Sequence, residues 1–260
     1  MTWIAQPSPA QDITFNWNTD GSGYWHDGGN WDQGIAPSGA NHIVVIDRPG
    51  ANPTITFNAT SGTWLVKSLA SQEKIVLSGG TLELVDPGQL NDSFTIMGGT
   101  LKGGVITTGS GVDFNGSGNN RLDAVTLHGS LNLVNSFDYT KILNGLTLNG
   151  TANLAGNSST LEFEGTQSLA ADVGNTATVN LGYQSSQLRV TNGGTLTLDS
   201  TVTVVGKGYV SGMGGGDTIH NHGVIHANVN NGTLYINPST FTNTGTLKAS
   251  NNALISPAAR

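Results

Sequence analysis

The sequence contains no cysteine and few charged residues. Without cysteine no disulfide bond can hold the fold together, so stability must come from core packing and backbone hydrogen bonds. Asp, Glu, Lys and Arg make up 10% of the chain, against roughly 25% in an average globular protein. Helix surfaces normally carry these residues, so their scarcity disfavours a helical protein.

Basic residues and long apolar runs are also scarce. The 10 Lys and Arg residues are scattered and the net charge is -7, which gives no cationic stripe for a phosphate backbone. We therefore expect no nucleic-acid partner. No apolar run reaches the roughly 20 residues that span a bilayer, so we expect no membrane insertion of this segment. Residues 1–10 lack the charged start and apolar core of a signal peptide. Export must therefore be inferred from other features of the sequence.

Glycine, threonine, serine and asparagine supply most of the remaining polarity. Glycine alone accounts for 37 of 260 residues. Glycine and asparagine adopt the positive φ angles of turns, and threonine suits the pleated surface of a strand. Since Gly, Thr and Asn are poor helix formers, this composition predicts an all-β protein of short strands and many turns.

Short phrases recur along the chain. Segment 219–227 reads Ile-His-Asn-His-Gly-Val-Ile-His-Ala, and segment 241–249 repeats its pattern as Phe-Thr-Asn-Thr-Gly-Thr-Leu-Lys-Ala. A second phrase, Gly-Thr-Leu-x-apolar or a close variant, begins at Gly80, Gly99, Gly129, Gly194 and Gly232. Many of the gaps fall near 20 residues, which is typical of one coil of a repeat protein.

Each phrase alternates apolar and polar residues, the period of a half-buried strand. Leu82 and Leu84 would point inward, while Thr81 and Glu83 would face water. Stacking such strands about 4.8 Å apart creates a continuous core that one strand lacks. The pattern predicts a parallel β-helix of nine or ten coils of roughly 20 residues. A two-sheet sandwich is the alternative, although it does not require the same phrase at corresponding places.

Asparagine recurs at an inward position of the repeat, at Asn221 and Asn243. A buried amide is costly unless it is paired, and stacked copies can bond each other along the axis. The other interpretation is an asparagine with positive φ at a turn before glycine. Either interpretation is compatible with a β-helix.

The two ends of the chain differ in composition. Tryptophan gathers between residues 15 and 64, and a terminal coil must be covered because it has no neighbour. We assign residues 1–65 to an aromatic-rich N-terminal cap with the first coils, and residues 66–260 to one continuous solenoid. Residues 254–257 carry no cap signal, so we expect the natural chain to continue and the solenoid ends to favour self-association.

Two stretches resemble known families. Segment 241–249 is similar to the repeat of filamentous haemagglutinin-type adhesins. The stretch from Trp25 to Ile46, with Asn-Trp, Gly-x-x-Pro and a following Val-x-Ile, resembles the start of autotransporter passenger β-helices. The resemblance implies a right-handed parallel β-helix, export in Gram-negative bacteria, and a role in adhesion or scaffolding.

Aligning the repeats places eight residues at an equivalent outward position, where they would form a shallow polar groove. These are Glu83, Lys102, Asn132, Glu162, Asn180, Thr197, Tyr235 and Lys248. Among them Asn132, Asn180, Thr197 and Tyr235 are candidate glycan-binding residues, because their side chains bond sugar hydroxyls or stack on a sugar face. The alternative is an ordinary solvated sheet face.

Carboxylates offer a weaker, catalytic alternative. Glycoside hydrolysis needs two of them, and a polysaccharide lyase would want a basic residue among carboxylates. Glu162 and Glu164 share one strand face, and Asp113 and Asp123 flank a loop that contains Arg121. With 17 acidic residues thinly spread, chance proximity is the favoured explanation of these groupings.

Two metal sites are also conceivable. His220, His222 and His226 form the one histidine cluster, although His-x-His alone is a weak signal for zinc or copper. Asn18, Asp20 and Ser22 resemble the start of a calcium loop. The last ligand of an EF-hand calcium loop is acidic, and here its position falls on Gly29, which has no side chain to bind calcium. A plain glycine-rich turn without a cofactor is therefore favoured.

The sequence therefore predicts a non-catalytic, extracellular or cell-surface β-helix that acts as an adhesin or structural scaffold. Its expected partners are a polysaccharide or a host or cell-surface glycan, or further copies of itself. The alternatives are a glycan-active enzyme on the same fold, either a lyase or a hydrolase, and a carbohydrate-binding module.

Overall fold

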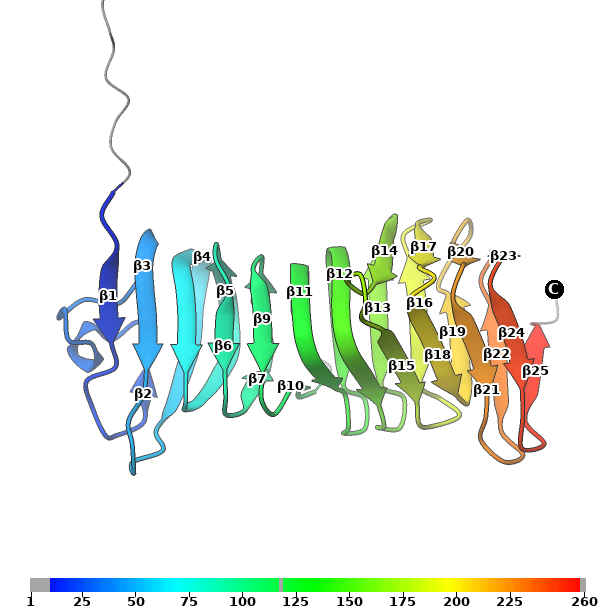
Figure 1. Cartoon of the computed structure of the whole chain (residues 1–260), viewed down its shortest axis with the longest axis horizontal. Coiled ribbons are helices and arrows are strands. Elements are labelled where there is room, and N and C mark those ends of the chain that lie inside the picture. The colour runs from blue at the N-terminus through cyan, green and yellow to red at the C-terminus, as the bar shows by residue number, and fades with distance from the viewer. Residues whose placement is uncertain (1–9, 117–118, 258–260) are drawn as a thin grey trace, which may run out of the picture.

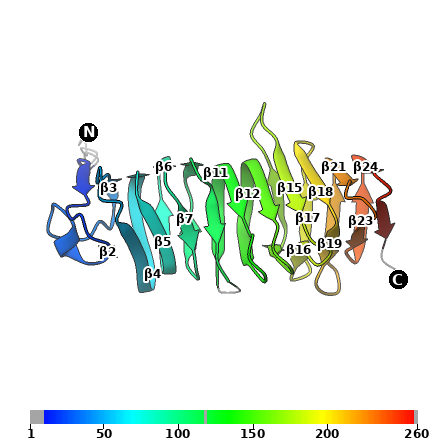
Figure 2. The ribbon, with the colours of Figure 1, turned by 90° about the horizontal axis from the view of Figure 1, so that it is seen from below.

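A computed structural model describes residues 10–116 and 119–257, with side chains for all of these except residues 59–61. Residues 1–9 of the expected cap lie outside the described residues. Strands dominate the chain, and the helical content of the described part is one 3-10 turn, η1 (Gly28–Asn30). The strands stack into an elongated parallel β-solenoid of about 10 turns, with coils of about 21 residues (Figure 1, Figure 2).

The coils build three parallel sheets, which we call sheets I, II and III. Sheet I contains β1 (Ile13–Asn16), β3 (Gly39–Ile46), β6 (Gly88–Leu90), β9 (Val105–Thr108), β14 (Gln167–Ala170), β17 (Thr195–Leu198), β20 (Thr218–Asn221) and β23 (Thr240–Asn243). Sheet II contains β2 (Gly23–Tyr24), β7 (Phe94–Ile96), β10 (Val112–Phe114), β15 (Ala177–Leu181), β18 (Val202–Gly206), β21 (Val224–Ala227) and β24 (Thr246–Ala249).

Sheet III contains β8 (Thr100–Lys102), β13 (Thr160–Glu164), β16 (Gln187–Thr191), β19 (Gly208–Gly212), β22 (Thr233–Asn237) and β25 (Leu254–Pro257). Four longer strands bend around corners and join more than one sheet: β4 (Thr54–Ser71), β5 (Lys74–Leu84), β11 (Arg121–Asn132) and β12 (Tyr139–Leu154). Every named pairing is parallel, which excludes the two-sheet sandwich.

The core is a set of apolar stacks along the axis. Leu82, Leu101, Leu122, Ile142 and Phe163 occupy one such stack in sheet III, and each is at most 1% exposed. The alternating sequence pattern places every second side chain inside, as predicted. Fully burying one aliphatic or aromatic side chain contributes about 1.5–3 kcal/mol, so the stacks are the main source of stability.

The corners absorb differences in coil length. Hydrogen-bonded residues in adjacent coils are 19 apart at Asp113 and Asn132, but 27 apart at Glu162 and Arg189. Tight corners need residues without a side chain: Gly206 has a φ of 117°, and a Cβ atom there would lie 2.1 Å from a backbone oxygen of the adjacent coil. Coil length therefore varies while the sheets stay in register.

An aromatic cluster closes the N-terminal end. Trp17, Trp25 and Trp31 are each at most 2% exposed, and the rings of Trp17 and Trp25 each lie 5.1 Å from the ring of Trp31 in an edge-on arrangement. The Trp31 indole N–H donates to the carbonyl oxygen of Trp25 at 2.7 Å. The predicted aromatic cluster is confirmed, whereas the division of the chain at residue 65 stays a prediction.

The other end of the described stack leaves apolar side chains uncovered. Leu247 pairs with the buried Ile225 and is 40% exposed, because no further coil of the described chain covers it. Leu254 is 63% exposed for another reason, since it pairs with Thr233 at an outward position. The same end holds the asparagine pair: Asn221 is 1% exposed and donates to Asn243 Oδ1 at 2.6 Å. Both residues lie within strands without a positive φ, so the interpretation as an axial ladder is confirmed and the turn interpretation is wrong.

Candidate functional site

The eight residues expected in one outward row lie on different sheets. Asn132 and Asn180 share one row of sheet II, Thr197 belongs to sheet I, and Tyr235 belongs to sheet III. Glu162 is only 4% exposed. The expectation of one groove is wrong because the repeated phrase occurs in strands of all three sheets, so that equal phrases do not mark equal positions around the coil. Whether any of these residues contacts a glycan stays a prediction.

The row on sheet II is an amide ladder. Asn132 donates to Asp113 Oδ1 at 2.9 Å, and Asn153 of the next coil donates to Asn132 Oδ1 at 3.0 Å. Asn180 continues the row and is exposed. These side chains reinforce the stacking of neighbouring coils, and Asn180 is the member of the row most open to an external ligand.

Tyr235 stacks on Tyr209 of the preceding coil. Their ring centroids lie 5.0 Å apart with 18° between the ring planes. One face of each ring is therefore covered by the other ring. The pair is half-buried, and the free face of Tyr235 is turned toward the next coil, where Ser256 is its neighbour.

The most connected polar cluster surrounds Glu162 on sheet III. One carboxylate oxygen accepts a hydrogen bond from the Tyr139 hydroxyl at 2.8 Å, and the other accepts one from Arg189 Nε at 2.7 Å. Lys141 Nζ lies 3.5 Å from Glu162 and also pairs with Glu164. These five residues come from adjacent strands β12, β13 and β16, and two carboxylates balance two cations.

Burial and the hydrogen bond to Glu162 raise the pKa of the Tyr139 phenol well above its ordinary value of 10.0. The guanidinium of Arg189 also lies over the Tyr139 ring, 5.8 Å from its centroid. Both oxygens of Glu162 already have donors, so a substrate or a water molecule would have to displace Tyr139 or Arg189 to reach it. The cluster is built to join coils, and its chemistry is that of a buried ion pair.

The other catalytic grouping is not assembled. Asp113 lies on sheet II and bonds Asn132, whereas Arg121 and Asp123 lie on sheet III. The Arg121 guanidinium donates to a backbone oxygen of the neighbouring loop at 3.2 Å, and Asp123 accepts from Asn144 at 2.6 Å. Each of the three side chains therefore has its own local partner.

The three histidines each bond a hydroxyl group of the next coil. His220 contacts the Thr242 hydroxyl, His222 Nδ1 lies 2.6 Å from the Thr244 hydroxyl, and His226 Nε2 lies 2.8 Å from the Ser250 hydroxyl. Burial, followed by the nearby charge of Lys248, lowers the pKa of His226. Within residues 10–116 and 119–257, no three His, Cys, Asp or Glu side chains gather closely enough to share a metal ion.

The residues of the conceivable calcium loop have protein partners. Asp20 forms an ion pair with Arg48, and the Ser22 hydroxyl accepts the backbone N–H of Thr54 at 2.9 Å. The backbone N–H of Asn18 donates to the carbonyl oxygen of Asn30 at 2.7 Å. These contacts fasten the loop to the first coils, and binding of calcium there is still an untested expectation.

Sequence reasoning missed Tyr139 and Arg189 as partners of Glu162. Arg189 lies 27 residues beyond Glu162, so a search at a fixed spacing near 20 does not align them. The usable signal is the pattern itself: the segments Thr160–Glu164 and Gln187–Thr191 both alternate polar and apolar residues and carry opposite charges at matching places.

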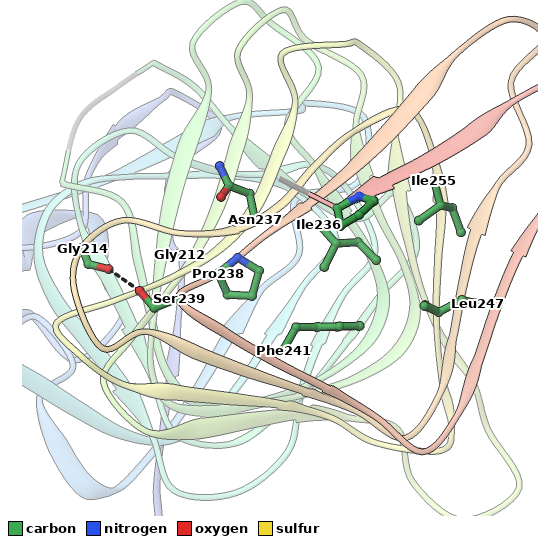
Figure 3. Close-up of a pocket in the computed structure, with 10 residues that line it drawn as sticks. Gly212, Gly214, Ile236, Asn237, Pro238, Ser239, Phe241, Leu247 and Ile255 are labelled. Carbon is green, nitrogen blue, oxygen red and sulfur yellow. Dashed lines mark hydrogen bonds between the residues drawn. The ribbon is translucent and has the colours of Figure 1, made fainter. Parts of the chain in front are cut away.

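Sequence reasoning predicted no cap at the C-terminal end of the solenoid, but it did not predict the hollow that lies there. Figure 3 shows Phe241, Ile236, Leu247 and Ile255 around this hollow, with Ser239 bonded to Gly214 at its edge. Its volume is about 590 Å³. The apolar residues are core positions of the last coils, so the hollow is the uncovered end of the core.

No helix in the described part of the chain has the length and apolarity needed to cross a bilayer. Comparison with protein-family models, curated proteins and solved structures finds no match for the chain.

Proposed function

We propose that the chain is a non-catalytic β-helical rod that acts as an adhesin or structural scaffold segment, outside the cell or at a bacterial surface. The observation that carries the proposal is that the side chains with catalytic or metal-binding potential bond to neighbouring coils. Glu162, His220, His222 and His226 all bond a residue of an adjacent coil. Polar groups that in an enzyme would face a substrate here hold coils together.

The composition supports export. The chain has no cysteine and 10% charged residues, and its surface depends on Thr, Asn and Ser. Three parallel sheets bonded along one axis form a stiff body that presents outward residues at regular steps. A rod of this kind separates a contact surface from its point of attachment, which is the mechanical task of an adhesin or scaffold.

The test is incubation of the purified protein with a panel of soluble and insoluble polysaccharides. We expect no new reducing ends and no unsaturated products. Turnover of any polysaccharide that disappears in Glu162→Gln would overturn the proposal in favour of a glycan-active enzyme. A variant with unchanged surface, Leu82→Val, serves as the control for a general loss of stability.

A second candidate function is glycan binding without turnover, favoured by the stacked Tyr209–Tyr235 pair. An aromatic ring with one free face can stack on a sugar ring, and the exposed amide of Asn180 on a different sheet would be a separate contact. Tyr235→Ala would then reduce retention on an insoluble glycan at least severalfold, while Tyr183→Ala, a change at another exposed tyrosine, would not. Equal retention of both variants would remove Tyr235 from the contact.

Self-association is the remaining part of the proposal, and a second copy is the partner. Tryptophans close one end of the rod, whereas the core residue Leu247 is exposed at the other end of the described stack, together with unpaired strand edges. A contact between two open ends would bury both surfaces. Light scattering after size exclusion should show a concentration-dependent dimer, which Leu247→Lys should abolish. A wild-type chain that stays monomeric at high concentration would contradict it.

A further inference from the structure

Asp217 is a buried acidic residue that the proposed function does not use. It lies directly before β20, at the corner where sheet III passes into sheet I, and it is 0% exposed. Neither of its carboxylate oxygens has a hydrogen-bond partner among the described residues. No Lys, Arg or His nitrogen of that part of the chain forms an ion pair with it. An isolated buried carboxylate is strongly unfavourable without a compensating group.

Asp138 shows how the same fold treats another buried carboxylate. It is also 0% exposed and lies at a corner directly before a strand segment. One of its oxygens accepts the backbone N–H of Gly116 at 2.9 Å, and the other accepts that of Asn135 at 2.6 Å. Backbone donors therefore satisfy Asp138 completely. Asp217 lacks these donors, and its carboxylate needs a positive group of another kind.

The surroundings of Asp217 are rich in oxygen and free of bulk. Residues 214–216 are three consecutive glycines, so no side chain of this loop fills the space beside the carboxylate. The carbonyl oxygens of Gly214 and Gly216 each accept one hydroxyl hydrogen bond, from Ser239 and Thr218, and each keeps a second lone pair. Asp217 Oδ2 lies 3.6 Å from the position that a Cβ atom of Gly214 would take, so the carboxylate faces this loop. A Cβ atom at Gly212 would lie 2.5 Å from the Asp217 Cβ, so a larger residue would close the space.

The next coil adds a hydroxyl group to the same corner. Ser239 takes the place equivalent to Asp217, because Thr218 pairs with Thr240. The Ser239 hydroxyl donates to the Gly214 carbonyl oxygen at 2.9 Å and accepts the Gly216 N–H at 3.3 Å (Figure 3). One carboxylate, one hydroxyl and the carbonyl groups of Gly214 and Gly216 thus lie at the same corner, and all of them are hard oxygen ligands.

We propose that Asp217, Ser239 and the carbonyl groups of residues 214–216 form a binding site for a hard cation of the calcium class. Calcium accepts six to eight oxygen ligands at flexible angles, whereas magnesium demands a near-octahedral set. A single carboxylate among neutral oxygens predicts modest affinity, with a Kd of about 10⁻⁴–10⁻³ M, as in extracellular calcium modules. The bound cation neutralises the buried charge and fixes the glycine loop beside the open end of the core.

The test is calorimetric titration of the full chain with calcium chloride after treatment with a chelator, together with melting curves. We expect one calcium per chain and a rise in Tm of a few degrees at saturating calcium, reversed by the chelator. Asp217→Asn keeps the shape but removes the charge, so it should lose both the binding heat and the rise in Tm. Ser239→Ala, at an exposed position, should keep the fold and weaken binding by about three- to tenfold.

Asp138→Asn is the matched control, because it neutralises an equally buried carboxylate that already has two donors. This variant should melt at a lower temperature and still respond to calcium. The absence of calcium binding by the wild-type chain up to 10 mM, a concentration roughly tenfold above the weakest expected Kd, would overturn the proposal. A calcium response that persists unchanged in Asp217→Asn would overturn it too.

Discussion

The guanidinium group of Arg189 and the carboxylate of Glu162 form an ion pair across adjacent coils, with 2.6 Å between Arg189 Nη2 and Glu162 Oε2. The two side chains are only 18% and 5% exposed, so water screens their attraction weakly. The pair also joins β13 to β16, whose paired residues are 27 apart in the sequence. It therefore helps to fix the register of two strands whose coil is longer than the average of about 21 residues.

The first prediction concerns the loss of one member of this pair. Arg189→Met should lower the free energy of unfolding by about 3 kcal/mol, because it leaves a buried carboxylate with fewer partners. The double variant Glu162→Leu with Arg189→Met should recover most of that loss, since no charge is then left buried. Urea denaturation monitored by circular dichroism measures both. Equal stability of the single and double variants would contradict this explanation.

The second prediction concerns Tyr139. Tyr139→Phe removes the hydroxyl group that donates to Glu162 and should cost about 1.5–3 kcal/mol, the range for hydrogen bonds to a charged group. A raised pKa means that the neutral phenol is favoured in the folded state, so this stability is present below pH 10 and is lost as pH rises further. The gap between wild type and variant should thus shrink above pH 10. Tyr183→Phe, at an exposed tyrosine, is the control.

Sequence reasoning predicted the parallel stacking correctly because the coils that contain Asn221 and Asn243 are nearly equal in length. Their offset of 22 residues matches the true register, so the repeated phrase marks equivalent positions. The same reasoning failed between Glu162 and Arg189, since the corner before β15 lengthens that coil to 27 residues. Residues 172–176 of that corner face water and no core packing constrains their number, so the spacing of phrases carries no information about them.

The candidate sites were harder to predict than the fold for a related reason. The sequence predicts that Glu162 points outward, because it alternates with apolar neighbours, and the structure has this alternation. Its burial comes from the long side chains of Lys141 and Arg189 in the two adjacent coils, which contact the carboxylate. Side-chain lengths in adjacent coils decide exposure, and these are known only once the register is known.

The third prediction concerns the asparagine ladder. Asn243→Leu should leave the chain folded but lower the free energy of unfolding by about 1 kcal/mol, because the buried amide of Asn221 loses its acceptor. Replacing both residues by leucine should recover stability, since Leu198 already occupies the same stack in the preceding coil. Thermal melting of the two variants measures the difference. A double variant no more stable than the single one would be evidence against the ladder.

The fourth prediction concerns the aromatic cluster. Trp31→Ala should cost about 3–5 kcal/mol, as large-to-small changes at buried aromatics do. Because coils contact only their neighbours, the damage should be local. Hydrogen exchange should accelerate in β1 and β3, while exchange in β20 to β24 should stay at the wild-type rate. Faster exchange along the whole chain would show that the solenoid unfolds as one unit.

The fifth prediction concerns acid. The backbone N–H of Thr201 donates to Asp199 at 3.0 Å and, with the nearby hydroxyl groups, lowers the pKa of this carboxyl below its ordinary value of 3.8. A lowered pKa adds stability above the ordinary value and loses it as pH falls through the folded-state pKa. Asp199→Asn should therefore be less stable than wild type at neutral pH, and the gap should close below about pH 4. Asp47→Asn, at an exposed residue, is the control for the loss of one surface charge.

The variable corners have an evolutionary consequence. At Val173, which is fully exposed between β14 and β15, the chain leaves the sheets and returns without disturbing the register on either side. Lengthening such a loop costs little, since each doubling adds only about 0.6 kcal/mol of closure entropy. Insertions and deletions can accumulate there while the strands keep their partners. Descendants of one ancestral rod can therefore diverge in outline and in exposed surface far faster than in architecture.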